Sequence, residues 1–144
     1  MHDISRTDAD PATALPRFNV PLELGLFLGA KRYGSRNQKL KSCLILDLER
    51  YRFQKFISDI AGQDIAAHGG EPPRAIRAIR DWLSNTMPKS VAIPGGTAIT
   101  TRYEMFRAEL PSLCERLNLR VDELTFNNYV VQVEEWLKGN SLGM

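Results

Sequence analysis

The chain has 144 residues, of which 43% are hydrophobic and 25% are charged, and its formal net charge is +2. This length can build one compact core but is too short for two ordinary domains. The small charge excludes the basic surplus of a dedicated nucleic-acid-binding protein. No apolar run approaches the roughly 20 residues of a membrane span, and the N-terminus is too polar for a signal peptide. We therefore expect a cytoplasmic protein without a membrane partner.

The first part of the chain predicts a strand, a loop and a long helix. Residues 2–5 resemble the end of a strand, and residues 7–17 lack periodicity, which predicts a surface loop. From Val20 to Tyr33, apolar residues occupy nearly every helical position, and Asn19 is placed to cap the helix. This pattern predicts a helix that is buried on all sides.

The middle of the chain alternates between helices and strands. Residues 31–41 carry five basic and no acidic side chains, which predicts a mobile loop. Ser42–Leu48 is an apolar run typical of a strand buried on both faces of a parallel sheet. Apolar spacing then predicts a helix at Tyr51–Ala61, a short strand at Asp64–Ala67, and a further helix that begins at Pro72.

The end of the chain predicts helices only. Residues 84–97 are rich in proline and glycine and mark a boundary. Helical spacing follows from Ile99 to Leu117, where Pro111 is expected to split or kink the helix, and again from Thr125 to Lys138. We therefore expect an α/β domain at 1–87 and a helical C-terminal extension, packed on that domain, at 88–144.

The expected fold class is α/β, with a small parallel sheet flanked by helices. Two or three strands form a sheet too small to cover its apolar helices. Either another copy of the chain completes it, as in a homo-oligomer, or a first β-α unit is absent from the N-terminus. Both explanations predict an apolar surface that invites association.

Polar residues at three places are candidates for chemistry. Glu23 is a carboxylate in an apolar helix, which is costly unless the group is paired or faces water. Asp3 and Ser5 end the first strand and Asp47 ends the second, and ligands bind outside the carboxyl ends of parallel strands. The structural alternative is that Glu23 stabilises the first helical turn and that the aspartates form turns.

The segment Arg17–Gly29 reads Arg-Phe-Asn-Val-Pro-Leu-Glu-Leu-Gly-Leu-Phe-Leu-Gly and follows a strand end with Asp3. It resembles the nucleoside 2-deoxyribosyltransferases and the bacterial TIR-like domains that bind nucleotides or hydrolyse NAD. The resemblance implies a flavodoxin-like or TIR-like fold that lacks its first β-α unit here. It also implies that Glu23 faces the ribose, as nucleophile or as stabiliser of the oxocarbenium ion. The residues that would bind the nucleoside are Asp3, Ser5, Asn19 and Asp47.

Three functions follow from these observations. The first is cleavage or transfer at the N-glycosidic bond of NAD or a nucleoside, with NAD or a nucleotide as substrate and without a cofactor or a metal. The second is a non-catalytic nucleotide-binding or protein-interaction module, in which the C-terminal helices bind a partner. The third, nucleic-acid binding through residues 31–41, is disfavoured by the small net charge.

Overall fold

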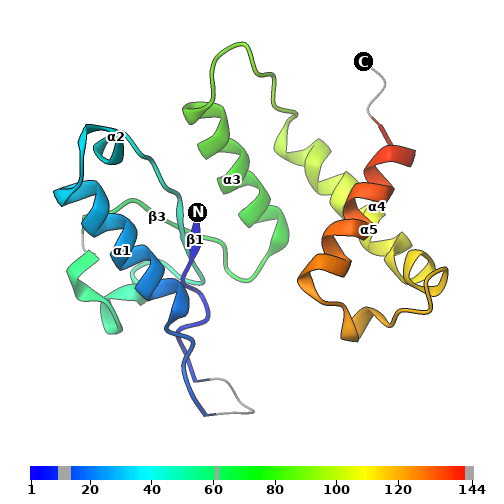
Figure 1. The fold of residues 1–144 in the computed structure, drawn as a ribbon, viewed down its shortest axis with the longest axis horizontal. Helices are drawn as coiled ribbons and strands as arrows, with labels where there is room; N and C mark the ends of the chain where they lie inside the picture. Colours follow the sequence, from blue (N-terminus) through cyan, green and yellow to red (C-terminus); the bar gives the residue numbers. More distant parts are fainter. Residues whose placement is uncertain (10–13, 61, 142–144) are drawn as a thin grey trace. The chain divides into compact units, whose positions relative to one another are not determined.

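The computed structural model describes residues 1–9, 14–60 and 62–141 (Figure 1). By its internal contacts the chain divides into two compact units, Met1–Gly96 and Thr97–Met144. The first contains the sheet, and the second contains helices. Each unit is described by itself below.

The first unit is built on a parallel sheet of three strands. These are β1 (His2–Asp3), β2 (Ile45–Asp47) and β3 (Ile65–Ala67), with β2 in the centre. His2 pairs with Ile45, and Ile45 pairs with Ile65, so the three strands begin at the same level. All three residues of β2 are buried, as expected for a central strand. The prediction of an α/β chain with a small parallel sheet is confirmed.

The helix α1 (Asn19–Tyr33) packs on the core of the sheet through one side. Leu24 is its buried residue and joins the core with Ile4 and Ile45. The prediction of a helix buried on all sides is wrong, because Leu22 and Leu26 are 64% and 67% exposed. A small sheet offers α1 a single surface, so only the residues that face it lose contact with water.

Two details near α1 also differ from the prediction. Asn19 is not the N-cap, since it is the first helical residue and follows the N-cap Phe18, which makes no side-chain capping bond. The predicted loop at 31–41 is partly helical, because α1 continues to Tyr33 and α2 occupies Arg36–Lys39. The loop predicted at 7–17 holds an isolated antiparallel bridge from Ala9 to Pro16, while its residues 10–13 lie outside the described residues.

The single helix predicted at Tyr51–Ala61 is also wrong. The chain forms two 3₁₀-helices there, η1 (Arg52–Lys55) and η2 (Ser58–Ile60), and residue 61 lies outside the described residues. Phe53 and Ile60 are nevertheless buried in the core. The apolar spacing therefore reported which side of the segment is buried, but it did not distinguish a 3₁₀-helix from an α-helix.

The helix α3 (Pro72–Thr86) completes the first unit and contacts β3. It begins at Pro72, as predicted. The N–H groups of the first helical turn have no partner within the helix, so a proline, which has no N–H group, costs no hydrogen bond there. The indole N–H of Trp82 donates to the hydroxyl of Ser42 at 3.3 Å, which joins α3 to the segment before β2.

The helices of the second unit are α4 (Gly96–Glu115), which begins at the last residue of the first unit, the 3₁₀-helix η3 (Val121–Glu123) and α5 (Phe126–Gly139). Pro111 lies inside α4 and does not split it. Thr125 caps α5 in a reciprocal pair with Asn128. The core of this unit consists of Phe106, Leu110, Cys114 and Trp136. Within the described ranges, no helix has the length and apolar character needed to cross a membrane.

Candidate functional site

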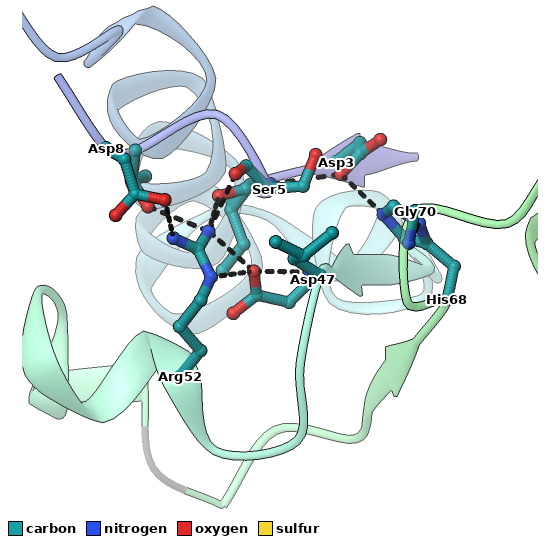
Figure 2. A network of polar contacts seen from close by, with 10 residues as sticks. Asp3, Ser5, Asp8, Asp47, Arg52, His68 and Gly70 are labelled. Atoms are coloured by element: carbon teal, nitrogen blue, oxygen red, sulfur yellow. Dashed lines mark hydrogen bonds and ion pairs between the residues drawn. The ribbon is translucent and has the colours of Figure 1, made fainter. Parts of the chain in front are cut away.

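The carboxyl ends of the three strands bring polar side chains together from distant parts of the chain (Figure 2). Asp3 ends β1 and Ser5 follows it, Asp47 ends β2, and His68 follows β3. Parallel strands direct their carboxyl ends to one edge of a sheet. Three of the sequence-predicted site residues, Asp3, Ser5 and Asp47, therefore lie along the same edge.

Arg52 joins this edge from the segment that follows β2. Its side chain is 6% exposed, and that of Asp47 is 0% exposed. Arg52 Nη2 lies 2.7 Å from Asp47 Oδ1, and Arg52 Nε donates to the same oxygen at 2.9 Å. Arg52 Nη1 donates to Asp8 Oδ2 at 2.8 Å. Arg52 Nη2 also lies within hydrogen-bonding distance of Thr7 Oγ1, at 3.0 Å, and of the carbonyl oxygens of Ile4 and Ser5, at 2.9 Å each.

These contacts give Asp47 a structural role. The planar guanidinium group of Arg52 presents its donors in a fixed fork, and here they hold the loop after β1 against the end of β2. Asp47 Oδ1 also accepts the N–H of Leu48 at 2.7 Å. Asp47 Oδ2 is buried and has no hydrogen-bond partner among the described residues. A ligand could reach Asp47 only if Arg52 moved, because protein atoms enclose the carboxylate completely.

Asp3 lies on the accessible side of the same edge. Its side chain is 46% exposed, and its Oδ1 accepts the N–H of Ser5 at 3.0 Å. The same oxygen lies 3.5 Å from His68 Nε2, which is longer than an ordinary hydrogen bond, and Nε2 has no hydrogen-bond partner among the described residues. Asp3 can therefore accept further hydrogen bonds from a ligand.

His68 is oriented by the turn after β3. Its Nδ1 accepts the N–H of Gly70 at 3.1 Å, so the neutral ring carries its proton on Nε2, which faces Asp3. Gly69 and Gly70 have φ angles of +65° and +75°, in the region that favours glycine. The turn therefore depends on this glycine pair, and it holds the imidazole beside the carboxylate.

A pocket of about 150 Å³ opens at Asp3. This volume is smaller than the roughly 300 Å³ at which pockets for drug-sized ligands begin, so it can hold one ring-sized group but not a whole nucleotide. Its walls come from the loop after β1 and from the start of α1. They consist of Asp3, Ile4, Ser5, Arg6, Thr7, Arg17, Val20 and Pro21.

Glu23 and Asn19 are exposed on α1 and do not line this pocket. Glu23 follows Val20 by three residues, which places it one helical turn beyond the pocket wall. Glu23 is exposed to water, so its carboxylate does not bear the cost of desolvation that a buried position in an apolar helix would impose.

The charge of Glu23 acts on His2 at the start of β1. Burial lowers the pKa of His2 from its ordinary value, and the N-terminal ammonium group lowers it as well. The Glu23 carboxylate opposes both effects and raises the pKa. His2 also contacts the ring of Phe27, with 5.7 Å between the ring centroids. Glu23 is thus electrostatically coupled to the strand whose other end carries Asp3.

Two larger hollows lie elsewhere in the first unit, with volumes of about 380 Å³ and about 270 Å³. The first lies beside Tyr51 and Asp64, and the second lies beside Lys31 and Asp59. None of the five predicted site residues lines either hollow. Among the residues that the structure describes, no group of three or more His, Cys, Asp or Glu side chains could hold a metal ion.

Sequence reasoning missed Arg52 and His68. No motif marks Arg52, whose position depends on the turn at Tyr51, a residue with a left-handed φ of +64°. A signal for His68 was present, because it follows a predicted strand at the edge where site residues collect. The two glycines after His68 are typical of a turn, and the structure shows a turn there in which His68 takes part.

Comparisons with protein-family models, with curated proteins and with solved structures found no match to this chain. The candidate site is the carboxyl edge of a parallel sheet, where one carboxylate is enclosed by an arginine and another is exposed beside a pocket.

Proposed function

We propose that the first unit binds a nucleoside or nucleotide at the carboxyl edge of its sheet, and that it cleaves or transfers the N-glycosidic bond of NAD or a nucleoside. The fold we propose for this unit is flavodoxin-like or TIR-like. The observation that carries the proposal is the exposed carboxylate of Asp3 at the mouth of a pocket that fits one ring. The resemblance of the segment 17–29 to nucleoside-processing families supports the same ligand class.

A ribose ring suits this pocket chemically. Its hydroxyl groups can donate to the Asp3 carboxylate, and the Ser5 hydroxyl group can donate or accept beside it. The apolar side of the sugar can pack against Val20 and Pro21. Arg6 and Arg17 add positive charge at the pocket, which favours a ligand that carries a phosphate.

In this proposal Glu23 acts on the transition state. Water adds to C1′ of the ribose, and the electron pair of the N-glycosidic bond leaves on the base. The proton lost by the water goes to the departing base of a nucleoside, or to solvent when neutral nicotinamide leaves NAD. The oxocarbenium character of C1′ develops only as the bond breaks, so a nearby carboxylate stabilises the transition state more than the bound substrate. For Glu23 to act on C1′, the bound nucleoside must extend from the pocket along one turn of α1. A nucleoside is larger than the pocket and can extend in this way.

The test is hydrolysis of NAD and of nucleosides by the full chain and by variants of single residues. Glu23→Gln keeps the size of an exposed side chain and removes its charge, so release of nicotinamide or free base should fall about 100-fold while folding is unchanged. Glu104→Gln, an exposed position on α4, is the matched control and should keep full activity. Equal activity of Glu23→Gln and the wild type would remove Glu23 from the mechanism. Failure of the wild type to bind any of these ligands in calorimetry would overturn the whole proposal.

One observation favours the second candidate, a non-catalytic nucleotide-binding module. Asp3 and Ser5 line the pocket, whereas Glu23 does not. A binding module predicts saturable ligand binding without turnover. Asp3→Asn should then weaken binding about tenfold, because the amide lacks the negative charge that strengthens the hydrogen bond from a ligand hydroxyl group, while Glu23→Gln should leave binding unchanged.

A further inference from the structure

The side of α1 that faces away from the sheet carries a row of exposed apolar side chains. Phe18, Leu22, Leu26 and Tyr33 are 62%, 64%, 67% and 82% exposed. At 3.6 residues per turn these positions fall on one side of the helix, and the buried Leu24 falls on the other. We call these four residues, together with the glycines between them, the outer stripe.

Two glycines interrupt the large side chains of the outer stripe. A β-carbon added at Gly25 or at Gly29 would meet no atom within 4 Å. Neither glycine is therefore required by packing within the chain, although glycine weakens a helix. Their effect is to leave shallow depressions beside Leu22 and Leu26, where the backbone of another helix could come close.

The order of large and small residues in the outer stripe is symmetric about the midpoint between Gly25 and Leu26. Phe18 and Tyr33 lie at equal distances on either side of it, and so do Leu22 and Gly29. Two such helices, placed antiparallel about a twofold axis, would set each leucine of one copy opposite a glycine of the other. The two aromatic residues would face each other at the ends. A surface that is complementary to itself in this way is what a twofold interface requires.

We propose that the outer stripe is the contact between two copies of this chain, with their α1 helices antiparallel. Each large side chain exposes on the order of 100–200 Å². Four such side chains together offer less than the roughly 800 Å² that each partner of a stable complex buries, so we expect a weak, reversible dimer. Lys31 and Arg32 carry the same charge in both copies, so apolar contact holds the dimer and it persists at high salt.

Cysteine crosslinking of the full chain tests the orientation. In the antiparallel register the two copies of residue 26 are one residue apart along the axis, about 1.5 Å, whereas the two copies of residue 22 are seven residues apart, about 10 Å. Leu26→Cys should therefore form a disulfide-linked dimer under mild oxidation, and Leu22→Cys should not. The wild type, which contains Cys43 and Cys114, gives the background. Crosslinking of neither variant, or of both equally, overturns the antiparallel contact.

Sedimentation between about 1 and 200 µM tests the contact without an added cysteine. Leu26→Glu and Gly29→Leu should each raise the dissociation constant at least about tenfold, because one places a charge and the other a bulky side chain at the contact. Phe126→Glu, at a position 80% exposed in the second unit, is the control and should leave the dissociation constant unchanged. Circular dichroism should show that all variants are folded. A wild type that is monomeric throughout, or a dimer unaffected by Leu26→Glu, overturns the proposal.

Discussion

Asp47 and Asp3 end neighbouring strands of the sheet, and their surroundings differ completely. Asp47 is 0% exposed and is held by Arg52, whereas Asp3 is 46% exposed and lines a pocket. The parallel order of the strands brings both carboxylates to one edge of the sheet. The segments that pack over each carboxylate determine whether a ligand can reach it. The loop after β1 and the turn at Tyr51 enclose Asp47 and leave Asp3 open. A carboxylate at a strand end is therefore a candidate ligand only where no cation of the chain already occupies it.

The largest expected effect on stability concerns Asp47, the enclosed carboxylate, and its partner Arg52. Arg52→Met should lower the free energy of unfolding by about 3–5 kcal/mol, because it leaves the Asp47 carboxylate buried without its cation. Urea unfolding measures this. Arg50→Met, at an exposed position two residues earlier, should change the free energy by less than about 0.5 kcal/mol. A cost below about 1 kcal/mol for Arg52→Met would mean that Asp47 does not depend on Arg52.

The interior of β2 gives a reference for that cost. Leu46 is 2% exposed and precedes Asp47, so Leu46→Ala should cost about 2–5 kcal/mol through lost burial and the cavity left behind. The same urea experiment measures it. A cost similar to that of Arg52→Met would show that the polar network contributes as much as a core residue. A cost near zero would contradict the burial of β2.

The fold was predictable where one physical cause dominates. The apolar run at Ser42–Leu48 predicted the buried strand, because both faces of a central parallel strand lose water. The predictions failed where the same apolar pattern has two outcomes. Apolar residues all round α1 indicated burial, but the pattern cannot tell a side covered by the chain from a side left exposed. The spacing at 51–61 fixed the buried side and not the helix type.

The candidate site was predictable only in part. The rule for strand ends brought Asp3, Ser5 and Asp47 to one edge without any knowledge of side-chain contacts. The separation of Asp47 from Asp3 could not be predicted, because it depends on Arg52 reaching residues more than 40 positions earlier in the chain. Contacts over such distances leave no local pattern in a single sequence.

Substitution of Asp3, the exposed carboxylate, should affect ligand binding but not the stability of the fold. Asp3→Asn should change the free energy of unfolding by less than about 0.5 kcal/mol, because the side chain is solvated and its one local bond, to the N–H of Ser5, can be kept by an amide oxygen. The same change at Asp47 should be clearly destabilising, since it removes half of a buried ion pair. Parallel urea unfolding of the two variants measures the difference. Equal changes in the free energy of unfolding would contradict the different roles given to Asp3 and Asp47.

The smallest expected effect concerns His2, which precedes Asp3 in β1 and is half-buried. Burial lowers the pKa of His2 in the folded chain, the N-terminal ammonium group adds to this, and Glu23 opposes it. The unfolded chain therefore binds a proton near the ordinary value of 6.5, while the folded chain binds it only at lower pH. The contribution of His2 to stability is present above pH 6.5 and is lost as the pH falls through the lowered folded pKa, because the unfolded state then holds more protons.

Thermal unfolding of the wild type and of His2→Gln between about pH 7 and pH 5.5 isolates this contribution, since the carboxylates titrate mostly below that range. The wild type should lose more stability on acidification than the variant. Nuclear magnetic resonance of the imidazole then tests the coupling to α1, because Glu23→Gln should lower the pKa of His2 further by removing the one charge that raises it. An unchanged pKa of His2 would show that the Glu23 charge does not act on β1. A lowered pKa, with stability nearly constant, would confirm that the Glu23 charge acts on the start of β1.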